Sequence, residues 1–106
     1  MILNYYLLVS NMMKNNILLR KDIGSFLRSA RINKSLTGLQ LGEILHVSQQ
    51  QISRYERGET SINIETLDIL LAVLDKDWPD FFFQVLANYS EEIADMKMQN
   101  DFIFLN

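Results

Sequence analysis

The chain has 106 residues, of which 48% are hydrophobic and 22% charged, with one proline, four glycines and no cysteine. This composition is typical of one small globular domain, and it excludes a disulfide framework and a cysteine-based metal site. The formal net charge of −3 argues at first against a nucleic-acid-binding protein, since such domains are usually basic.

The charges are divided unevenly along the chain. Residues 1–13 carry none, residues 14–57 carry eight basic and three acidic groups, and residues 58–106 carry two basic and ten acidic groups. The two charged parts therefore hold +5 and −8. An asymmetry of this size indicates a charged partner for one half, although two ordinary solvated surfaces would give the same count.

Several protein classes are excluded by what the sequence lacks. No uninterrupted apolar run reaches the roughly 18 to 20 residues needed to cross a membrane, and the apolar N-terminus lacks the basic segment of a signal peptide. A single histidine, His46, and the absence of cysteine leave little from which to build a zinc site or a nucleophilic catalytic site. We therefore expect a cytoplasmic protein that is not an enzyme, uses no cofactor and does not enter a membrane.

Three helices are predicted in the first 58 residues, after an N-terminal extension (1–16) that carries only Lys14 as a charged residue and can be disordered. Apolar residues at helical spacing predict an amphipathic helix over residues 22–33. A second helix of about eight residues follows Thr37, which is a good N-cap, and a third follows the N-cap Ser48. Gly58 supplies the C-terminal stop of the third helix.

Two further helices are predicted before the C-terminal tail. The fourth follows the cap Asn63 and ends near Asp75, and the fifth runs over residues 81–88 after a Trp78-Pro79-Asp80 turn. Residues 91–98 can form another short helix. The predicted fold is all-α, with a helix-turn-helix domain over residues 17–88 and an acidic and apolar tail over residues 89–106.

The second and third helices are separated by one compact turn, which is the spacing of a helix-turn-helix motif. At about 100° per residue, Gln50, Ser53, Arg54 and Arg57 share one side of the third helix, and Ile52 lies opposite. Gln can pair with adenine and Arg with guanine in the major groove. The alternative interpretation is an ordinary solvated polar face.

The region from Ile23 to Leu74 resembles the phage-repressor-like Cro/CI (XRE) family of helix-turn-helix regulators. The resemblance rests on I-G-x-x-L-R-x-x-R (residues 23–31), L-T-x-x-x-L (36–41) and V-S-Q-x-x-I-S-R-Y-E-x-G (47–58). It implies a five-helix lambda-repressor-like domain with a short C-terminal extension, whose partner is double-stranded DNA.

Roles for individual residues follow from the resemblance. It implies base reading by Gln49, Gln50 and Arg54, and a structural ion pair between Arg31 and Glu56. The helical spacing also supports the pair, because Glu56 lies on the buried side of its helix and a buried carboxylate needs a partner. Contacts with the DNA backbone, or auxiliary contacts, are expected from Thr37, Gln40, Gln51, Ser53 and Arg57.

The chain departs from the family pattern at three positions. Gly38 stands where Gln commonly touches a phosphate, so that contact is in doubt, and Gln40 is an alternative source of it. Gly42 replaces a small Ala at the helix crossing. His46 occupies a turn position usually held by Gly, where a left-handed backbone is expected and His is tolerated.

Within the family, the run from Ser48 to Glu56 and the W-P-D-F-F stretch (78–82) are similar to the MrpJ-like regulators of enterobacterial fimbrial operons. This resemblance implies repression of flagellar genes and regulation of fimbrial genes. Two rival functions remain open. One is an antitoxin that sequesters a toxin through residues 90–106, and the other is a protein-interaction module that binds no DNA.

A two-fold dimer is expected, because helix-turn-helix regulators bind paired half-sites about one helical turn, roughly 34 Å, apart. The surface that joins the two copies is left open by the sequence. The apolar residues of the predicted fifth helix either pair across the two-fold axis or complete the core of a single domain; they are Phe81, Phe82, Phe83, Val85 and Leu86.

Overall fold

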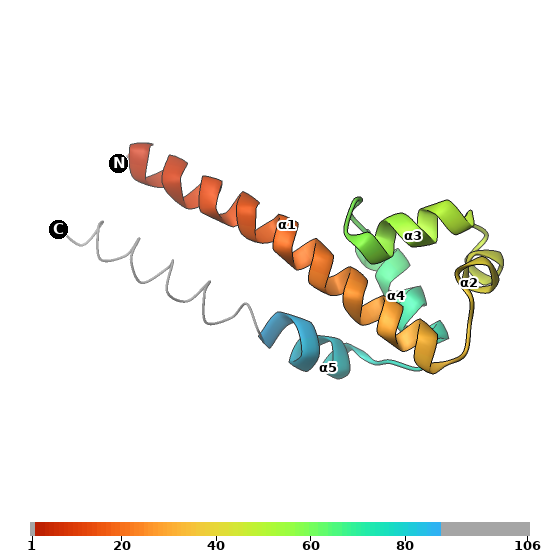
Figure 1. Ribbon diagram of the computed structural model, residues 1–106. Coiled ribbons are helices and arrows are strands. Elements are labelled where there is room, and N and C mark those ends of the chain that lie inside the picture. Colours follow the sequence, from red (N-terminus) through yellow and green to blue (C-terminus); the bar gives the residue numbers. More distant parts are fainter. Residues whose placement is uncertain (1, 88–106) are drawn as a thin grey trace.

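The protein is described by a computed structural model whose described part comprises residues 2–87, and these residues form helices with no β-strand among them (Figure 1). The predicted all-α fold is confirmed. The elements are α1 (Ile2–Asn33), α2 (Gly38–Leu45), α3 (Gln49–Arg57), α4 (Ile64–Val73), α5 (Trp78–Phe81) and the π-helical turn η1 (Phe82–Leu86).

The first helix is much longer than the sequence predicted. The sequence predicted a separate extension over residues 1–16, which can be disordered, and a helix over residues 22–33, but α1 is one helix of 32 residues from Ile2 to Asn33. The reason is that residues 2–21 contain no proline or glycine and many leucines and methionines, which favour helix. The first half of α1 projects away from the other helices (Figure 1).

The predicted N-caps of α2, α3 and α4 are confirmed. The Thr37 hydroxyl accepts from the Gln40 amide at 3.0 Å, and the Gln40 side chain accepts from the Thr37 amide at 2.8 Å, which completes a capping box. Ser48 Oγ accepts from the Gln51 amide at 3.1 Å, and Asn63 caps α4 in the same way. These hydrogen bonds satisfy amides that a helix start would otherwise leave unpaired.

The fifth helix begins earlier than predicted, at Trp78 rather than Phe81. Asp77 is its N-cap, and Asp80 completes a capping box by accepting from the Asp77 amide at 3.1 Å. Pro79 lies in the first turn, as predicted, where its missing amide hydrogen is not needed. The helix predicted over residues 91–98 and the tail over residues 89–106 lie outside the described residues.

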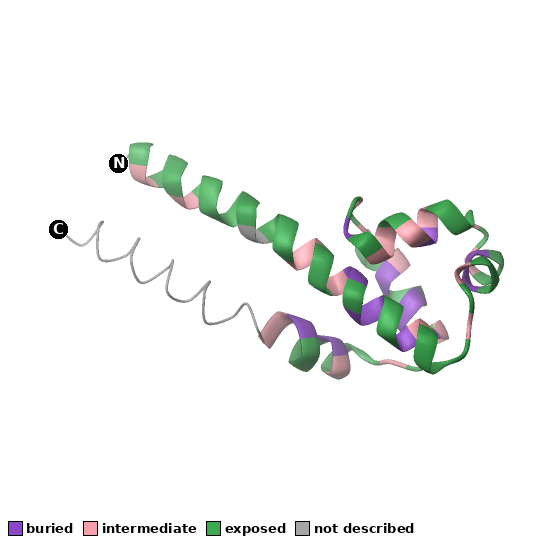
Figure 2. Cartoon of the chain, in the orientation of Figure 1, coloured by how far each residue is buried: buried purple, intermediate pink, exposed green. Residues whose placement is uncertain are grey.

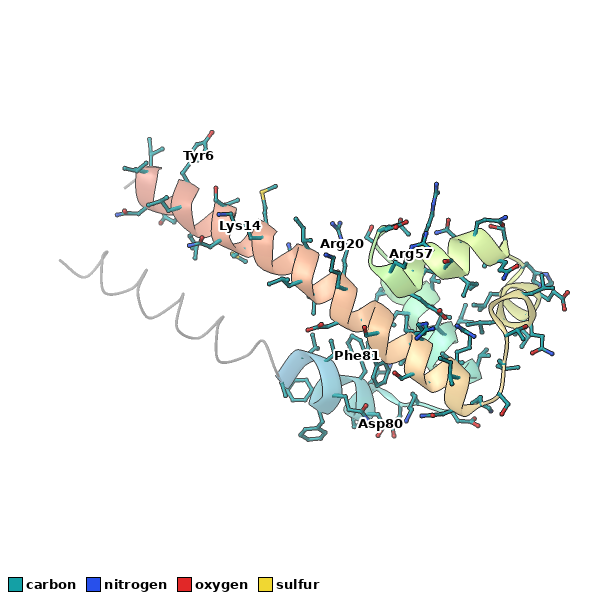
Figure 3. All side chains as sticks on the ribbon, viewed as in Figure 1. Tyr6, Lys14, Arg20, Arg57, Asp80 and Phe81 are labelled. Carbon is teal, nitrogen blue, oxygen red and sulfur yellow. The ribbon has the colours of Figure 1, made fainter. Side chains whose placement is uncertain are left out.

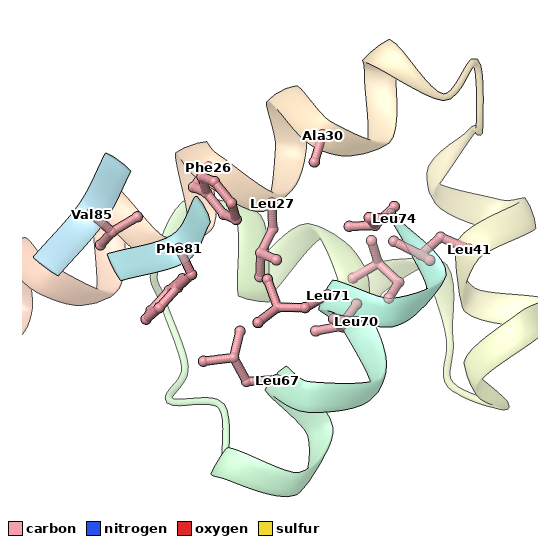
Figure 4. Close-up of a cluster of buried hydrophobic side chains, with 11 residues drawn as sticks. Phe26, Leu27, Ala30, Leu41, Leu67, Leu70, Leu71, Leu74, Phe81 and Val85 are labelled. Atoms are coloured by element: carbon pink, nitrogen blue, oxygen red, sulfur yellow. The ribbon is translucent and has the colours of Figure 1, made fainter. Parts of the chain in front are cut away.

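One hydrophobic core joins all the helices, and Figure 4 shows its side chains. Phe81 and Val85 are buried in it, and Leu86 packs against it, so these three residues complete the core of a single domain. Phe82 and Phe83 instead remain exposed. The buried residues are Phe26, Leu27, Ala30, Leu41, Ile52, Leu67, Leu70, Leu71, Leu74, Phe81 and Val85.

Burial changes along α1. One side of its second half is buried in the core, whereas the first half is green along most of its length in Figure 2, which marks exposed residues. Although the helix is long, neither it nor any other described helix is apolar enough over a sufficient length to cross a membrane.

Candidate nucleic-acid interface

A tight turn joins α2 to α3. His46 has φ 57° and ψ 39°, the left-handed conformation expected for it, and its amide donates to the carbonyls at the end of α2. A Cβ on Gly42 would lie 2.7 Å from the Val47 carbonyl oxygen, which is too close for a real contact. The two helices therefore approach more closely than an alanine at this crossing would permit.

The C-terminal end of α3 lies directly against α1. A Cβ on Gly24 would lie 2.4 Å from the Glu56 carbonyl oxygen and 2.5 Å from that of Tyr55. Gly58 ends α3 with φ 69°, and a Cβ there would lie 2.7 Å from the Lys21 backbone. Because the contacts are with backbone atoms, neither side can move away easily, and α1 fixes the position of α3.

The ion pair expected between Arg31 and Glu56 is present. Arg31 Nε and Nη2 donate to the two Glu56 carboxylate oxygens at 2.6 and 2.9 Å, and Nη1 donates to the Leu36 carbonyl at 2.8 Å. Hydrogen bonding to Glu56 raises the pKa of Arg31, although partial burial opposes this effect. The Arg31 side chain therefore ties together α1, the segment before α2, and the end of α3.

The opposite side of α3 faces solvent. Gln49, Gln50 and Arg54 are exposed, whereas Ile52 on the inner side is buried in the core. Gln51 and Ser53 are half-buried at the edges of this outer face. The helix is thus supported from behind by α1 and the core, and it presents amide and guanidinium groups outward.

The outward side chain of Arg57 is held by an acidic neighbour. Arg57 Nε and Nη2 donate to the two Glu59 carboxylate oxygens at 2.9 and 3.0 Å, and Nη1 also donates to the Ser53 hydroxyl. The hydrogen bonds to Glu59 raise the pKa of Arg57, and those from Arg57 lower the pKa of Glu59. We call this exposed pair the Arg57–Glu59 clasp; the sequence analysis missed it.

The N-terminus of α2 lies beside the first turn of α3. A Cβ on Gly38 would lie 3.7 Å from Gln49 Cγ, an ordinary contact distance. Thr37 and Gln40 are both exposed and are engaged with each other in the capping box. The cap uses oxygen atoms of these two side chains as acceptors, which leaves the Gln40 amide nitrogen able to donate to a phosphate.

A residue that the sequence analysis did not single out lies next to this surface. The Arg20 backbone on α1 is within 2.9 Å of a Cβ placed on Gly58, and Arg20 Nε is buried without a hydrogen-bond partner among the described residues. Figure 3 shows the Arg20 and Arg57 side chains on the same side of the molecule. The excess of basic groups over residues 14–57 was the only signal for it in the sequence.

The family model described as helix-turn-helix matches residues 27–81. This match includes the Arg31–Glu56 pair, the turn and the whole of α3. The chain belongs to this helix-turn-helix family. The resemblance to the Cro/CI (XRE) family is thus confirmed, whereas its narrower MrpJ-like part is not tested by the match.

Relatives among known proteins agree with the family. An uncharacterised helix-turn-helix-type transcriptional regulator of Rickettsia conorii is 35% identical over 75 residues, which are 69% of this chain and 59% of that protein. Its counterpart in Rickettsia prowazekii is also 35% identical, over 57% of its length. The antitoxin PezA of Streptococcus pneumoniae is 33% identical over 58 residues, which are 55% of this chain and 37% of PezA. The chain thus spans less than two thirds of these relatives.

A solved structure supports the predicted fold class. The crystal structure of the clp gene regulator ClgR from Corynebacterium glutamicum has a TM-score of 0.58 and 30% sequence identity. The similarity covers 82% of this chain and 88% of ClgR. The lambda-repressor-like all-α fold is therefore confirmed, and the family and its relatives support a DNA-binding regulator.

Proposed function

We propose that this chain is a sequence-specific transcriptional regulator that inserts α3 into the major groove of double-stranded DNA. The observation that carries the proposal is the position of Gln49, Gln50 and Arg54, which are exposed on a helix whose other side is fixed by α1 and the core. Gln can pair with the N6 and N7 atoms of adenine, and Arg with the O6 and N7 atoms of guanine.

Backbone contacts complete the proposed interface. Arg57 at the end of α3, and Thr37 and Gln40 at the start of α2, would bind phosphates. Gln51 and Ser53 would contribute at the edges of the groove. The excess of positive charge over residues 14–57 would release counterions on binding, so the affinity should fall steeply with salt. The acidic residues after Glu59 would face away from the DNA.

We further propose that the protein binds as a two-fold dimer and represses by blocking polymerase. Two copies would place their α3 helices roughly 34 Å apart on a partly palindromic site. The regulon implied by the resemblance is repression of flagellar genes and regulation of fimbrial genes. Genome-wide mapping of the DNA bound in cells tests this regulon, and a bound set without fimbrial or flagellar promoters would contradict it.

Substitution of the base-reading residues tests the DNA-binding proposal. Gln50→Ala and Arg54→Ala should each weaken binding to the preferred sequence by about 1 to 3 kcal/mol and leave binding to unrelated DNA nearly unchanged. Glu65→Ala, an exposed change on α4, is the control. Unchanged gel-shift affinity and specificity in both variants would contradict base reading by these residues, and a wild-type chain that shifts no DNA would favour the protein-interaction module.

An antitoxin is the second candidate function, because part of PezA is similar to this chain. The same DNA-binding surface would then regulate its own operon, while residues 90–106 would bind a toxin. Co-expression with the product of the adjacent gene tests this candidate. Rescue of growth from a toxic neighbour, with co-purification of the two proteins, would support it, and a fimbrial gene cluster would contradict it.

A further inference from the structure

The projecting half of α1 carries a continuous apolar stripe. At about 100° per residue the stripe lies within an arc of roughly 80° on the helix, so its side chains share one face. Each is between 48% and 79% exposed. The residues of the stripe are Ile2, Tyr6, Val9, Met13 and Ile17.

The same face is covered in the second half of the helix. By the same angular count, Gly24 and Leu27 continue the line of the stripe, and there the face is filled by the backbone of α3 and by the core. The same face of α1 is therefore exposed before about residue 18 and covered after it. None of the other described elements covers its first half.

The stripe is suited to a close contact with another apolar helix. It borders an apolar groove of about 330 Å³ that is lined by α1 residues alone, among which Ser10 is the smallest. Residues 1–13 carry no charge, so two such surfaces can approach without repulsion between like charges. Figure 3 shows Tyr6 pointing outward from this end of the helix.

We propose that the stripe is the dimer interface and that it pairs antiparallel with the stripe of a second copy of this chain. The two-fold axis passes near Val9 and Ser10, where the small serine permits close approach. Ile2 of one copy then meets Ile17 of the other, and Tyr6 meets Met13. The assignment rests on the dimeric binding proposed above, and it names the surface that produces the dimer.

The position of α3 excludes a parallel pair along this face. In a parallel pair both second halves of α1 would meet on the same side, where α3 already lies against Gly24 at backbone contact distance. In an antiparallel pair each stripe covers only the first half of its partner, and the two domains lie at opposite ends. The two Lys14 residues are then about 13 Å apart along the helix axis instead of at the same level.

The area of the stripe is sufficient for a specific contact. At about 100 Å² for each of the five side chains on two arms, pairing removes about 1,000 Å² from water, which reaches the area that a specific interface needs. The rival surface, Phe82 and Phe83, consists of two exposed rings in edge contact at 5.5 Å. It offers much less area, and both rings lie at the turn η1 instead of along a helix face.

Single cysteines test the geometry in the full-length chain, which has no cysteine of its own. Under mild oxidation Val9→Cys should give a covalent dimer, because the two residues lie together at the axis. Ile2→Cys should not, because its two copies are about 22 Å apart in the antiparallel pair and a disulfide needs less than about 7 Å between Cα atoms. A mixture of Ile2→Cys and Ile17→Cys should crosslink to each other. Self-crosslinking of Ile2→Cys would overturn the antiparallel arrangement.

A charged residue placed on the stripe tests the interface, because it should weaken the dimer measured by sedimentation equilibrium. Val9→Lys should raise the dimer dissociation constant at least tenfold in sedimentation equilibrium. Leu7→Lys is the matched control, since Leu7 is similarly exposed (57% against 52%) and lies roughly 160° around the helix from Val9. It should change the constant by less than twofold. Loss of the dimer in Phe83→Lys, with Val9→Lys still dimeric, would overturn the assignment in favour of the rival surface.

The failure of this assignment can be distinguished from the failure of the proposed function. A chain that is monomeric at all concentrations and still binds a specific DNA sequence would overturn the interface and the dimeric binding but not the DNA-binding function. The stripe would then belong to residues 88–106 or to another protein. A chain that crosslinks through Val9→Cys and binds no DNA would overturn the function alone. Val9→Lys that is monomeric and keeps binding to a half-site, with loss of tighter binding to the full site, supports both.

Discussion

Two arginine–glutamate pairs lie at the two sides of α3, and they differ in burial and in the sequence separation of their partners. Arg31–Glu56, behind the helix, joins two elements that are distant in sequence, and its side chains are only 13% and 8% exposed. Arg57–Glu59, in front, joins neighbours in sequence, and more than half of each side chain is exposed. The first pair positions α3. The second pair, in the DNA complex proposed above, would open when a phosphate replaces Glu59. Each prediction below perturbs one side of this contrast.

The largest effect is expected from breaking the pair behind the helix. Glu56→Ala removes one partner and leaves the Arg31 guanidinium nearly buried, with its Leu36 contact but without a counter-charge. The free energy of unfolding should fall by about 3 kcal/mol, the lower end of what such a loss costs. Chemical denaturation measures it. Glu59→Ala is the matched control in front, and it should change the free energy of unfolding far less, because the pair it breaks is exposed to solvent. Equal losses in the two variants would contradict the contrast.

Replacement of two glycines by alanine should change the stability in opposite directions, depending on what surrounds each glycine. Gly24→Ala places a Cβ among backbone carbonyls at 2.4 and 2.5 Å and should destabilise the fold by about 2 kcal/mol. Gly38→Ala meets side chains only, at 3.7 Å or more, and should instead stabilise by about 0.5 to 1 kcal/mol through helix propensity. Thermal unfolding of the two variants checks both signs. A stable Gly24→Ala would show that α1 does not fix α3.

The clasp in front should change DNA affinity much more than stability. Arg57→Ala should weaken binding to every sequence and reduce the slope of log K against log salt by about one, as the loss of one phosphate contact predicts. Glu59→Gln should instead strengthen binding to every sequence, since it releases Arg57 and removes a negative charge near the DNA. Fluorescence anisotropy at several salt concentrations measures both slopes. Weaker binding in Glu59→Gln would show that the carboxylate does not compete with phosphate.

The smallest effect concerns the protonation of Glu59. Its hydrogen bonds from Arg57 lower the pKa of Glu59 below the 4.5 of a free glutamate, so the carboxylate stays charged to more acidic pH. The stabilisation from the clasp is therefore present above that value and is lost as the pH falls through the lowered pKa. NMR titration should show the lowered pKa, and Arg57→Ala should return it towards 4.5. An unchanged titration curve in Arg57→Ala would contradict the clasp.

Features set by single residue types were predictable from the sequence. Thr37, Ser48 and Asn63 carry side-chain acceptors that cap helices, and Gly58 tolerates the left-handed backbone, so the starts of α2, α3 and α4 and the end of α3 were correct. The start of α1 was wrong because a helix without a strong stop continues, and nothing in residues 2–21 marks an end. The start of α5 was wrong because Asp77 was not recognised as its N-cap.

Interactions that depend on distances in the folded structure were harder to predict from the sequence. The Arg31–Glu56 pair was expected because both residues match family positions and Glu56 lies on the inner side of α3. The closeness of Gly24 to the α3 backbone could not be seen in sequence, because it depends on how two helices cross. The clasp was missed because Glu59 lies in a loop, where helical angles do not predict which side chains meet.

The central claim is that the exposed side of α3 reads DNA bases. In vitro selection of preferred DNA sequences, by the wild type and by two variants, tests this claim. Arg54→Ala should lose the preference at one position of each half-site, and Arg57→Ala should keep the same preferred sequence at lower affinity. Arg54→Ala that selects the same sequence as the wild type, with no position changed, would contradict the claim.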